Sequence, residues 1–432
     1  MKKIILFLAF LLSSFIGKAQ VEGDDFYGDR KLRYNNYTYI PSIKSVECFN
    51  SRAVGSLPVF VLNSSSALFI SFDDLTENVK DLYYTIIHCD AQWNPTYLSA
   101  NEYIKGYTED RLLNFQFSFN TFKNFVHYDL VFPNANMRPS ISGNYIIKIY
   151  ENNNPELVIL SRRFMVLDSK VTVSGLVTQS TVIDERRTKQ KVNFTIEHKN
   201  LAILNPFLEI KAYVMQNQRW DNAKFNDRPI FIRTNQLIYD DVNTNVFNGG
   251  NEFRQFDIRS TRFKTQFVNN ITQDSLFNFY LSIDNVKNKN RFITNFDLDG
   301  NFRIANNEGV NPDIDADYCN VIFNLAYPIP KINGNFYLFG ALTNWQVKER
   351  FKLNYDYQYQ RYTTSQLLKQ GFYDYNYVFM EDGKQYADET ETEGDFFETE
   401  NDYYILVYNR PPNGLYDQLV GFLALNTLQD FR

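Results

Sequence analysis

The residue types that most often carry chemistry are few and scattered in this sequence. Three histidines each lie in or beside a stretch with β-strand character: His88, His127 and His198. No HExxH, GxxxxGK[ST] or GxSxG motif occurs, so the spacings of a zinc protease, a phosphate-binding loop and a hydrolase nucleophile are missing. A lone histidine in a strand is usually structural, although a Ser-His-Asp set can be assembled from distant positions. We expect a protein that is not an enzyme, and we identify no catalytic, cofactor-binding or metal-binding residues and no cofactor.

The three cysteines, Cys48, Cys89 and Cys319, fit neither a zinc site nor a disulfide scaffold, because no CxxC pair occurs and their number is odd. Cys48 and Cys89 fall in one expected domain and could pair in an oxidising compartment. The favoured alternative is that all three are buried free thiols, which behave as small apolar residues.

Two acidic stretches could attract a cation or a basic partner. Asp313-Ile-Asp-Ala-Asp317 supplies the first three ligand positions of a calcium loop, but Tyr318 replaces the glycine and Asn324 the bidentate glutamate. We therefore favour a solvated turn there. Glu381–Asp402 holds ten acidic residues and one lysine. Because like charges at this density repel, we expect an extended, solvated hairpin loop, with contact to a basic partner as the alternative.

Aromatic residues are unusually frequent, with 39 Phe, 30 Tyr and 3 Trp among 432 residues. Phe and Tyr favour half-buried pleated surfaces, so the composition indicates β structure. Trp93, Trp220 and Trp345 could form a stacking platform for sugars, but tryptophan in a sandwich is usually core. The formal charge of −6 shows no basic footprint, so we expect no nucleic-acid partner.

The N-terminus has the pattern of an export signal. Lys2 and Lys3 precede the uncharged stretch Ile4–Ile16, and Gly17-Lys18-Ala19 places small residues before a cut at Gln20. We predict a signal peptide over residues 1–19 and an exported, soluble mature chain. A retained membrane anchor is the alternative, but the stretch is short for a span, which needs about 20 apolar residues.

Short alternating stretches follow one another along the whole chain, and long helical periodicity is absent. In the first third, seven strands are expected: Pro58–Leu62, Ser66–Phe72, Leu82–His88, Phe115–Phe119, Tyr128–Phe132, Asn144–Tyr150 and Leu157–Val166. About seven short strands at this spacing are typical of an immunoglobulin-like sandwich. Further strands are expected later: Lys191–Glu197, Leu208–Val214, Phe253–Arg259, Phe277–Ile283, Tyr318–Tyr327, Gly334–Leu342, Phe351–Tyr359, Gly371–Met380 and Asp402–Tyr408. We predict an all-β fold of three consecutive immunoglobulin-like or early-set β-sandwiches, over residues 20–167, 168–311 and 312–432.

The last expected domain resembles the glycogen-binding early-set sandwiches that accompany amylolytic enzymes and kinase β-subunits. The residues that carry this resemblance are FYLFGALTNW (336–345), LLKQGFYDYNYVF (367–379) and Glu381-Asp-Gly383. The acidic tract after Gly383 departs from that family's short turn. This resemblance implies an exported carbohydrate-binding protein as the alternative function.

Taken whole, the mature chain resembles the plug proteins of the Bacteroidota type 9 secretion system. YYTIIHCDAQWNPTYL (83–98), SGNYIIKIYENNNPELVILSRRFMV (142–166) and YLFGALTNWQ (337–346) carry the resemblance. It implies a non-enzymatic periplasmic protein that occludes the periplasmic end of a large outer-membrane β-barrel translocon, its partner, without inserting into the membrane itself. The residues of the interface with that partner stay unknown, since no site residues carry over from the family.

Overall fold

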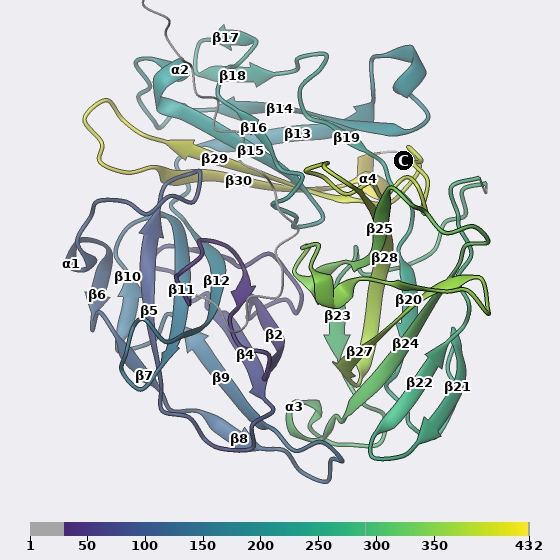
Figure 1. Cartoon of the computed structure of the whole chain (residues 1–432). Coiled ribbons are helices and arrows are strands. Elements are labelled where there is room, and N and C mark those ends of the chain that lie inside the picture. The colour runs from purple at the N-terminus through teal and green to yellow at the C-terminus, as the bar shows by residue number, and fades with distance from the viewer. Residues whose placement is uncertain (1–29, 290, 431–432) are drawn as a thin grey trace, which may run out of the picture.

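Alternating apolar residues build seven sheets in the residues that this computed structural model describes, 30–289 and 291–430 (Figure 1). The chain is therefore almost entirely β, as predicted, and its sheets pack as β-sandwich domains. The expected signal peptide, residues 1–19, lies outside the described residues. None of the helices in the described part of the chain has the length and apolar character that a membrane span requires.

The first domain, residues 30–167, is a two-sheet sandwich. One sheet has the order β1 (Tyr37–Thr38), β12 (Val158–Leu167), β11 (Gly143–Glu151), β5 (Leu82–Cys89) and β7 (Asp110–Leu112), with β3 (Val59–Val61) beside β12. The other has the order β2 (Ile43–Asn50), β4 (Leu68–Asp74), β9 (Val126–Phe132) and β8 (Phe115–Phe117). The helix α1 (Ala100–Tyr103) and the pair β6 (Ile104–Gly106) and β10 (Met137–Pro139) complete the domain. Alternate side chains of β4 and β11 lie in one core, as the period of two predicts: Leu68, Ile70, Phe72, Tyr145, Ile147 and Ile149.

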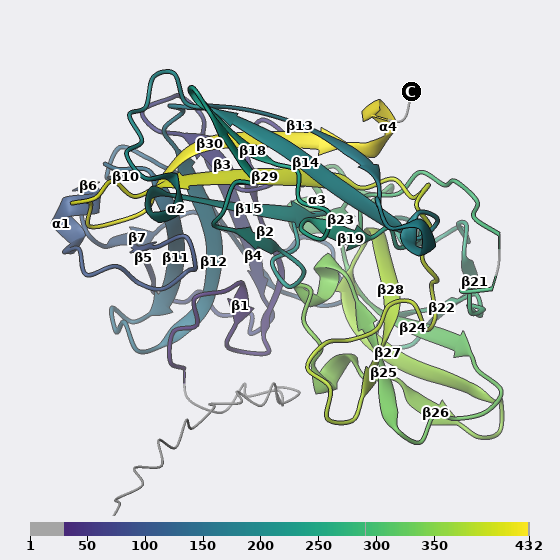
Figure 2. The same cartoon turned by 90° about the horizontal axis from the view of Figure 1, so that it is seen from above.

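The second domain is assembled from two segments, residues 168–249 and 401–430. Its first sheet contains β13 (Thr172–Gln179), β14 (Lys189–Glu197), β18 (Gln236–Tyr239) and β17 (Phe231–Arg233), with β19 (Val246–Asn248) beside β14. Its second sheet has the order β16 (Lys224–Asn226), β15 (Ile210–Gln216), β29 (Asp402–Asn409) and β30 (Gln418–Asn426). The short helices η1 (Ile183–Glu185), α2 (Pro206–Glu209) and α4 (Thr427–Asp430) flank these strands. In Figure 2 the yellow strands β29 and β30 lie among the teal strands of this domain.

The third domain, residues 250–400, is inserted between those two segments. One group of strands centres on β28 (Gly371–Glu381), which pairs with β20 (Arg254–Asp257), β23 (Phe302–Ile304) and β25 (Gly334–Phe339). The other sheet has the order β21 (Val268–Gln273), β22 (Phe277–Leu281), β24 (Tyr318–Ala326), β27 (Arg361–Lys369) and β26 (Asn354–Asp356). Three short helices, α3 (Pro312–Asp315), η2 (Ala341–Thr343) and η3 (Glu349–Phe351), lie between strands.

This insertion corrects the expected order of three consecutive domains. The boundary expected between residues 311 and 312 falls inside the third domain, because Phe256 and Phe279 share one core with Phe323. The last strands, expected in the third sandwich, instead close the second: Ile405 and Val407 of β29 are buried in its core. The chain thus leaves the second domain to build the third and then returns.

The alternating stretch over Phe351–Tyr359 is also corrected. Phe351 and Leu353 are buried as expected, but only Asn354–Asp356 forms a strand. The Asp356 carboxylate accepts hydrogen bonds from the backbone N–H groups of Gln358 and Tyr359 and so turns the chain. Tyr359 is consequently exposed, although the alternation places it on the buried face.

Candidate functional site

The histidines lie in structural environments. His88 is buried against the rings of Tyr145 and Tyr416, and burial lowers its pKa to about 4, so it is neutral near pH 7. His127 Nδ1 lies 2.7 Å from the Asp73 carboxylate, and its buried Nε2 has no hydrogen-bond partner. His198 Nδ1 bonds the carbonyl oxygen of Leu201. No serine therefore completes a Ser-His-Asp set with the Asp73–His127 pair in the described residues.

The cysteines are all free thiols. The pairing of Cys48 with Cys89, which the sequence left open, is not present. Burial raises the pKa of both Cys48 and Cys89 to about 12 and raises that of Cys319 as well. A thiol that stays protonated is a poor nucleophile, so these residues fill space in the cores.

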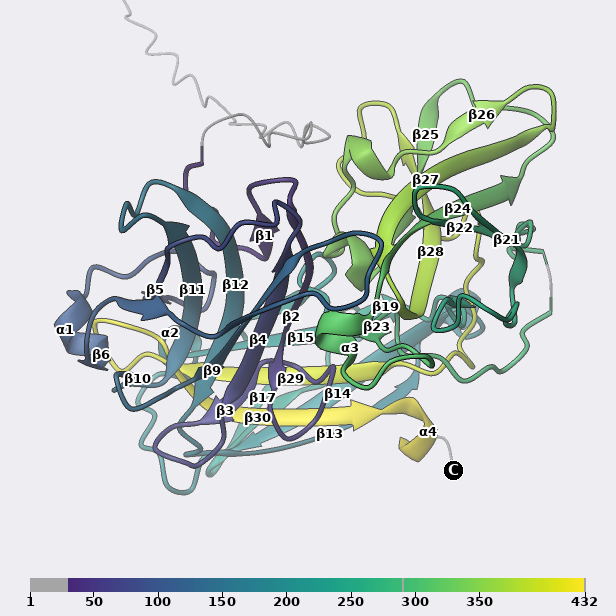
Figure 3. The same cartoon turned by 90° about the horizontal axis from the view of Figure 1, so that it is seen from below.

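The Asp313–Asp317 stretch uses its carboxylates to hold backbone. Asp315 accepts from the N–H groups of Val310 and Asn311. Asp317 accepts from Phe122 N–H at 2.7 Å and Lys123 N–H at 3.1 Å, both in the first domain. The stretch therefore ties the third domain to the first, and Figure 3 shows α3 between the two domains.

The later part of the acidic tract Glu381–Asp402 is packed structure, which contradicts the expected solvated loop there, whereas residues 382–386 are exposed. Thr392, Glu393 and Thr399 are almost completely buried. Cations from other segments compensate the charge: Arg254 with Glu393 at 3.0 Å, Arg219 with Glu389 at 2.7 Å and Lys331 with Glu391 at 2.8 Å. The repulsion that the sequence suggests is therefore reduced, because Glu389, Glu391 and Glu393 each meet a cation from another segment.

Trp345, in the segment that carries the resemblance to sugar-binding sandwiches, is partly buried. Its ring contacts Phe253 and Phe339, and the Arg219 guanidinium lies 4.8 Å from the ring centroid. Gly300 lies so close that an added Cβ would be 2.3 Å from the ring. Trp93 and Trp220 contact each other edge to face at 5.0 Å. Each of the three tryptophan rings therefore packs against another aromatic ring of the protein.

Buried charges form the junction between the first and third domains, which we call the ionic junction. Asp73 of β4 accepts hydrogen bonds from His127 Nδ1 at 2.7 Å, from the Tyr318 hydroxyl at 2.7 Å and from Lys369 Nζ at 2.6 Å. Asp73 and Lys369 are at most 2% exposed. A buried ion pair with several partners has strict geometry, so this cluster defines how the two domains meet.

Apolar side chains form the junction between the first and second domains, which we call the apolar junction. One continuous cluster joins β3, β5, β11 and β12 to β15, β29 and β30: Leu57, Val59, Cys89, Ala91, Trp93, Ile146, Met165, Leu167, Met215, Tyr404, Leu406, Tyr408 and Leu419. Polar contacts occur at its margin, where the buried Asp417 accepts from Ala91 N–H at 2.9 Å and pairs with Lys211 at 3.2 Å.

Where the second and third domains meet, side chains of the second domain donate hydrogen bonds to backbone carbonyl oxygens of the third. The buried Gln190 amide donates to the carbonyl oxygens of Phe397 and Thr399, and the Thr427 hydroxyl donates to the carbonyl oxygen of Thr399 at 3.4 Å. Each domain therefore contacts both of the others through buried side chains. The three domains form a closed arrangement rather than a string.

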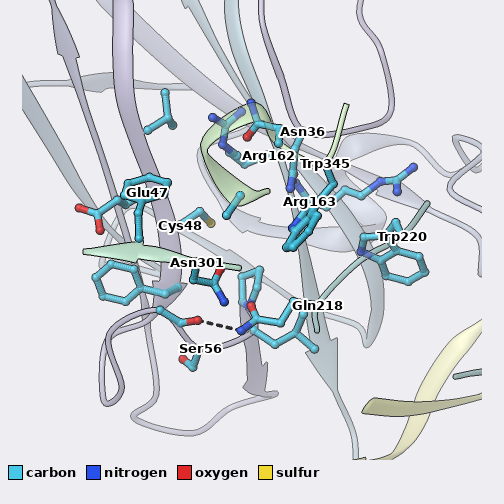
Figure 4. A pocket seen from close by; sticks show the side chains of 18 of the residues that line it. Asn36, Glu47, Cys48, Ser56, Arg162, Arg163, Gln218, Trp220, Asn301 and Trp345 are labelled. Atoms are coloured by element: carbon cyan, nitrogen blue, oxygen red, sulfur yellow. Dashed lines mark hydrogen bonds between the residues drawn. The ribbon is translucent and has the colours of Figure 1, made fainter. Parts of the chain in front are cut away.

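A cavity of about 120 Å³ lies where all three domains meet (Figure 4). Arg162 and Arg163 of β12 line it together with Asn36, Asn301 and Trp345. The sequence analysis did not identify this site. A signal was present, because the charged pair Arg162-Arg163 follows Ser161 in a strand that is buried on both faces and whose other residues are all apolar.

Two short edge strands expose apolar side chains at opposite ends of the molecule (Figure 1). All three residues of β8 are exposed, including Phe115 and Phe117, and so are all three of β17, including Phe231 and Ile232. Exposed apolar edges are uncommon in monomeric proteins and usually mark contact surfaces.

Comparisons with known proteins place the chain in a family. Residues 43–168 match the family model described as "Type 9 secretion system plug protein 1st domain", which coincides with the first sandwich. A crystal structure of a hypothetical protein from Parabacteroides merdae is similar over 92% of this chain and 100% of that one, with 31% identity and a TM-score of 0.88. No protein with curated annotation matches the sequence. The resemblance to glycogen-binding sandwiches receives no support from these comparisons. The matched family is described as a component of a secretion system and not as a class of enzymes. The chain belongs to the type 9 secretion system plug protein family.

Proposed function

We propose that this protein occludes the periplasmic end of the outer-membrane barrel through which the type 9 system secretes its cargo. It acts in the periplasm, held at the outer membrane by that barrel. The observation that carries the proposal is the closed arrangement of three domains, each of which contacts both others through buried groups. A stopper for a wide pore must resist deformation, and domains joined at a single linker would not.

Surface for a partner is also present. The exposed strands β8 and β17 carry phenylalanine and isoleucine side chains at two ends of the molecule. A stable interface needs about 1,200 Å² of total buried area, and a body of this size supplies it. Because a plug must come out, we expect moderate affinity despite a large contact area.

The deciding experiment removes the gene and follows two properties of the cell. Because a stopper takes no part in translocation, cargo secretion should continue, while the outer membrane becomes permeable to solutes that are normally excluded by size. Affinity purification of the tagged chain from detergent-solubilised envelopes should recover a very large outer-membrane β-barrel. Normal permeability in the deletion strain, together with recovery of soluble proteins or polysaccharide alone, would overturn the proposal.

A further inference from the structure

Two adjacent arginines in the three-domain cavity have no carboxylate partner among the residues that the structure describes. Arg162 is 3% exposed, and its Nη1 donates to the carbonyl oxygens of Tyr37 at 3.2 Å and Ser161 at 2.9 Å. Arg163 Nε donates to the carbonyl oxygen of Tyr34 at 2.9 Å, and its guanidinium lies 4.4 Å from the Trp93 ring centroid. Neutral groups thus orient both guanidiniums without compensating their charge.

The electrostatic surroundings leave both charges uncompensated. Burial lowers the pKa of Arg162 and of Arg163 to about 10, and the other groups that act on them are thiols and phenols rather than carboxylates. Both side chains are therefore protonated near pH 7. Two cations in a poorly solvated cavity are unfavourable unless an anion joins them.

The cavity walls supply what an anion with an organic body requires. Side-chain amides of Asn36, Asn301, Asn344 and Gln218 line it, and so do the apolar side chains of Leu57, Pro58, Met165, Phe302 and Trp345. A neighbouring space of about 250 Å³ continues past Arg163 and Trp345. Figure 4 shows Arg162 and Arg163 near Asn36 and Trp345, with the Arg163 guanidinium directed toward Trp220 and Glu47 at the left of the view.

The two carboxylates near these spaces do not compensate the arginines. Glu47 lines the cavity, but burial and repulsion by Asp313 raise its pKa to about 7, so it is only partly ionised at neutral pH. Asp221 lines the neighbouring space and is paired with Arg219 at 2.7 Å.

We propose that this cavity binds an organic carboxylate, which pairs with the Arg163 guanidinium while Arg162 contributes a second positive charge to the cavity wall; the carboxylate is either on a free small organic acid or on an acidic side chain of a peptide. A guanidinium presents a planar fork of donors that matches the two oxygens of a carboxylate. The apolar walls suit the hydrocarbon to which a carboxylate is attached and do not suit the hydration shell of inorganic phosphate. Because the first, second and third domains each contribute lining residues, an occupied site stabilises their arrangement.

Isothermal titration of the full mature chain tests this, with glutarate, a blocked Glu-Glu dipeptide and phosphate as probes at matched ionic strength. We expect one site for glutarate or the dipeptide and weaker binding of phosphate. Tighter binding of the dipeptide assigns the site to a protein ligand, and tighter binding of glutarate to a free acid. Arg163→Gln should weaken binding at least tenfold, whereas Arg228→Gln, which removes an exposed positive charge, should not.

Loss of the fold in Arg163→Gln is checked by circular dichroism, and the unmodified protein gives a second readout. Its melting temperature should rise with glutarate above the value in sodium chloride of equal ionic strength. The proposal fails if neither carboxylate probe gives heat or thermal protection beyond chloride, if phosphate binds as tightly, or if the two arginine variants bind alike. None of these readouts depends on secretion, so the result is independent of the proposed plugging role.

Discussion

Where the first domain meets the second, the buried side chains are apolar, whereas where it meets the third they are charged. The apolar junction continues the cores on both sides, and Leu406 and Met165 lie in it as they would in a single domain. The ionic junction places Asp73 between His127, Tyr318 and Lys369. Apolar contact is non-directional and contributes area, while a buried charge cluster tolerates few geometries. The apolar junction therefore holds the first and second domains together, and the ionic junction fixes the orientation of the first domain relative to the third.

Of the substitutions that test this comparison, removal of the Asp73 carboxylate should lower the free energy of unfolding the most. Asp73→Ala leaves the buried Lys369 ammonium without its carboxylate, and we expect a loss of about 4 kcal/mol in the free energy of unfolding. Guanidinium chloride unfolding measures it. The matched control is Asp81→Ala, because Asp81 pairs with Arg111 on the surface and such pairs contribute about 0.5 kcal/mol or less. Equal losses in the two variants would contradict the assignment of orientation to the ionic junction.

Shortening a side chain in the apolar junction should lower the free energy of unfolding somewhat less than the loss of Asp73. Leu406 is fully buried, and Leu406→Ala removes buried methyl groups and leaves a cavity, for which we expect a loss of about 3 kcal/mol. The same unfolding measurement applies, repeated at low and high salt. Leu415→Ala, at an exposed position, should stay within about 0.5 kcal/mol of the parent protein. A strong salt dependence of the Leu406→Ala effect would show that the junction is not mainly apolar.

Raising the pH should weaken the region beside the second–third junction. Burial, with repulsion from neighbouring carboxylates, raises the pKa of Glu252 and Asp374 to about 8 and that of Asp299 to about 9. The folded state thus binds protons that the unfolded chain has released, so the stabilisation is complete below about pH 4 and is lost as pH rises through 8 to 9. Melting temperatures between pH 5 and 10 should fall accordingly.

The variant Asp374→Asn isolates one of these groups. It keeps an acceptor for the Gly300 N–H group, which the Asp374 carboxylate bonds at 3.3 Å, and it removes the titrating carboxyl. We expect a shallower decline with pH and a gain on the order of 1 kcal/mol at pH 9 relative to the parent protein. An unchanged pH profile would show that Asp374 does not titrate in this range.

The smallest expected effect comes from a single polar contact within the apolar junction. The Tyr408 hydroxyl donates to Asn144 Oδ1 at 2.8 Å, and both residues are buried. Tyr408→Phe keeps the ring and should cost about 1 kcal/mol. Asn144 retains a second bond, from its Nδ2 to the carbonyl oxygen of Asp90, so a loss above that of Leu406→Ala would reverse the ranking of apolar and polar contributions.

Strand character and the first sandwich were readable from the sequence because their physical origin is local. Alternation in Leu68–Phe72 and Asn144–Tyr150 states which face of each strand is buried, and β4 and β11 bury those faces. β2 was not predicted, since Lys44, Ser45 and Glu47 interrupt its apolar pattern. Its residue Ser45 bonds the Tyr318 hydroxyl of the third domain, and no local pattern reports such a partner.

Alternation and turn residues by themselves determined an all-β chain of sandwiches, and the sequence contains no recognisable catalytic motif. The tertiary structure decided which sandwich each strand joins, since the buried face of β29 fits any apolar surface and only packing selects the second domain. It also decided that the later part of the acidic tract is packed and that Arg162 and Arg163 line a cavity. Charge compensation depends on distances between residues far apart in the chain, and those distances exist only in the folded molecule.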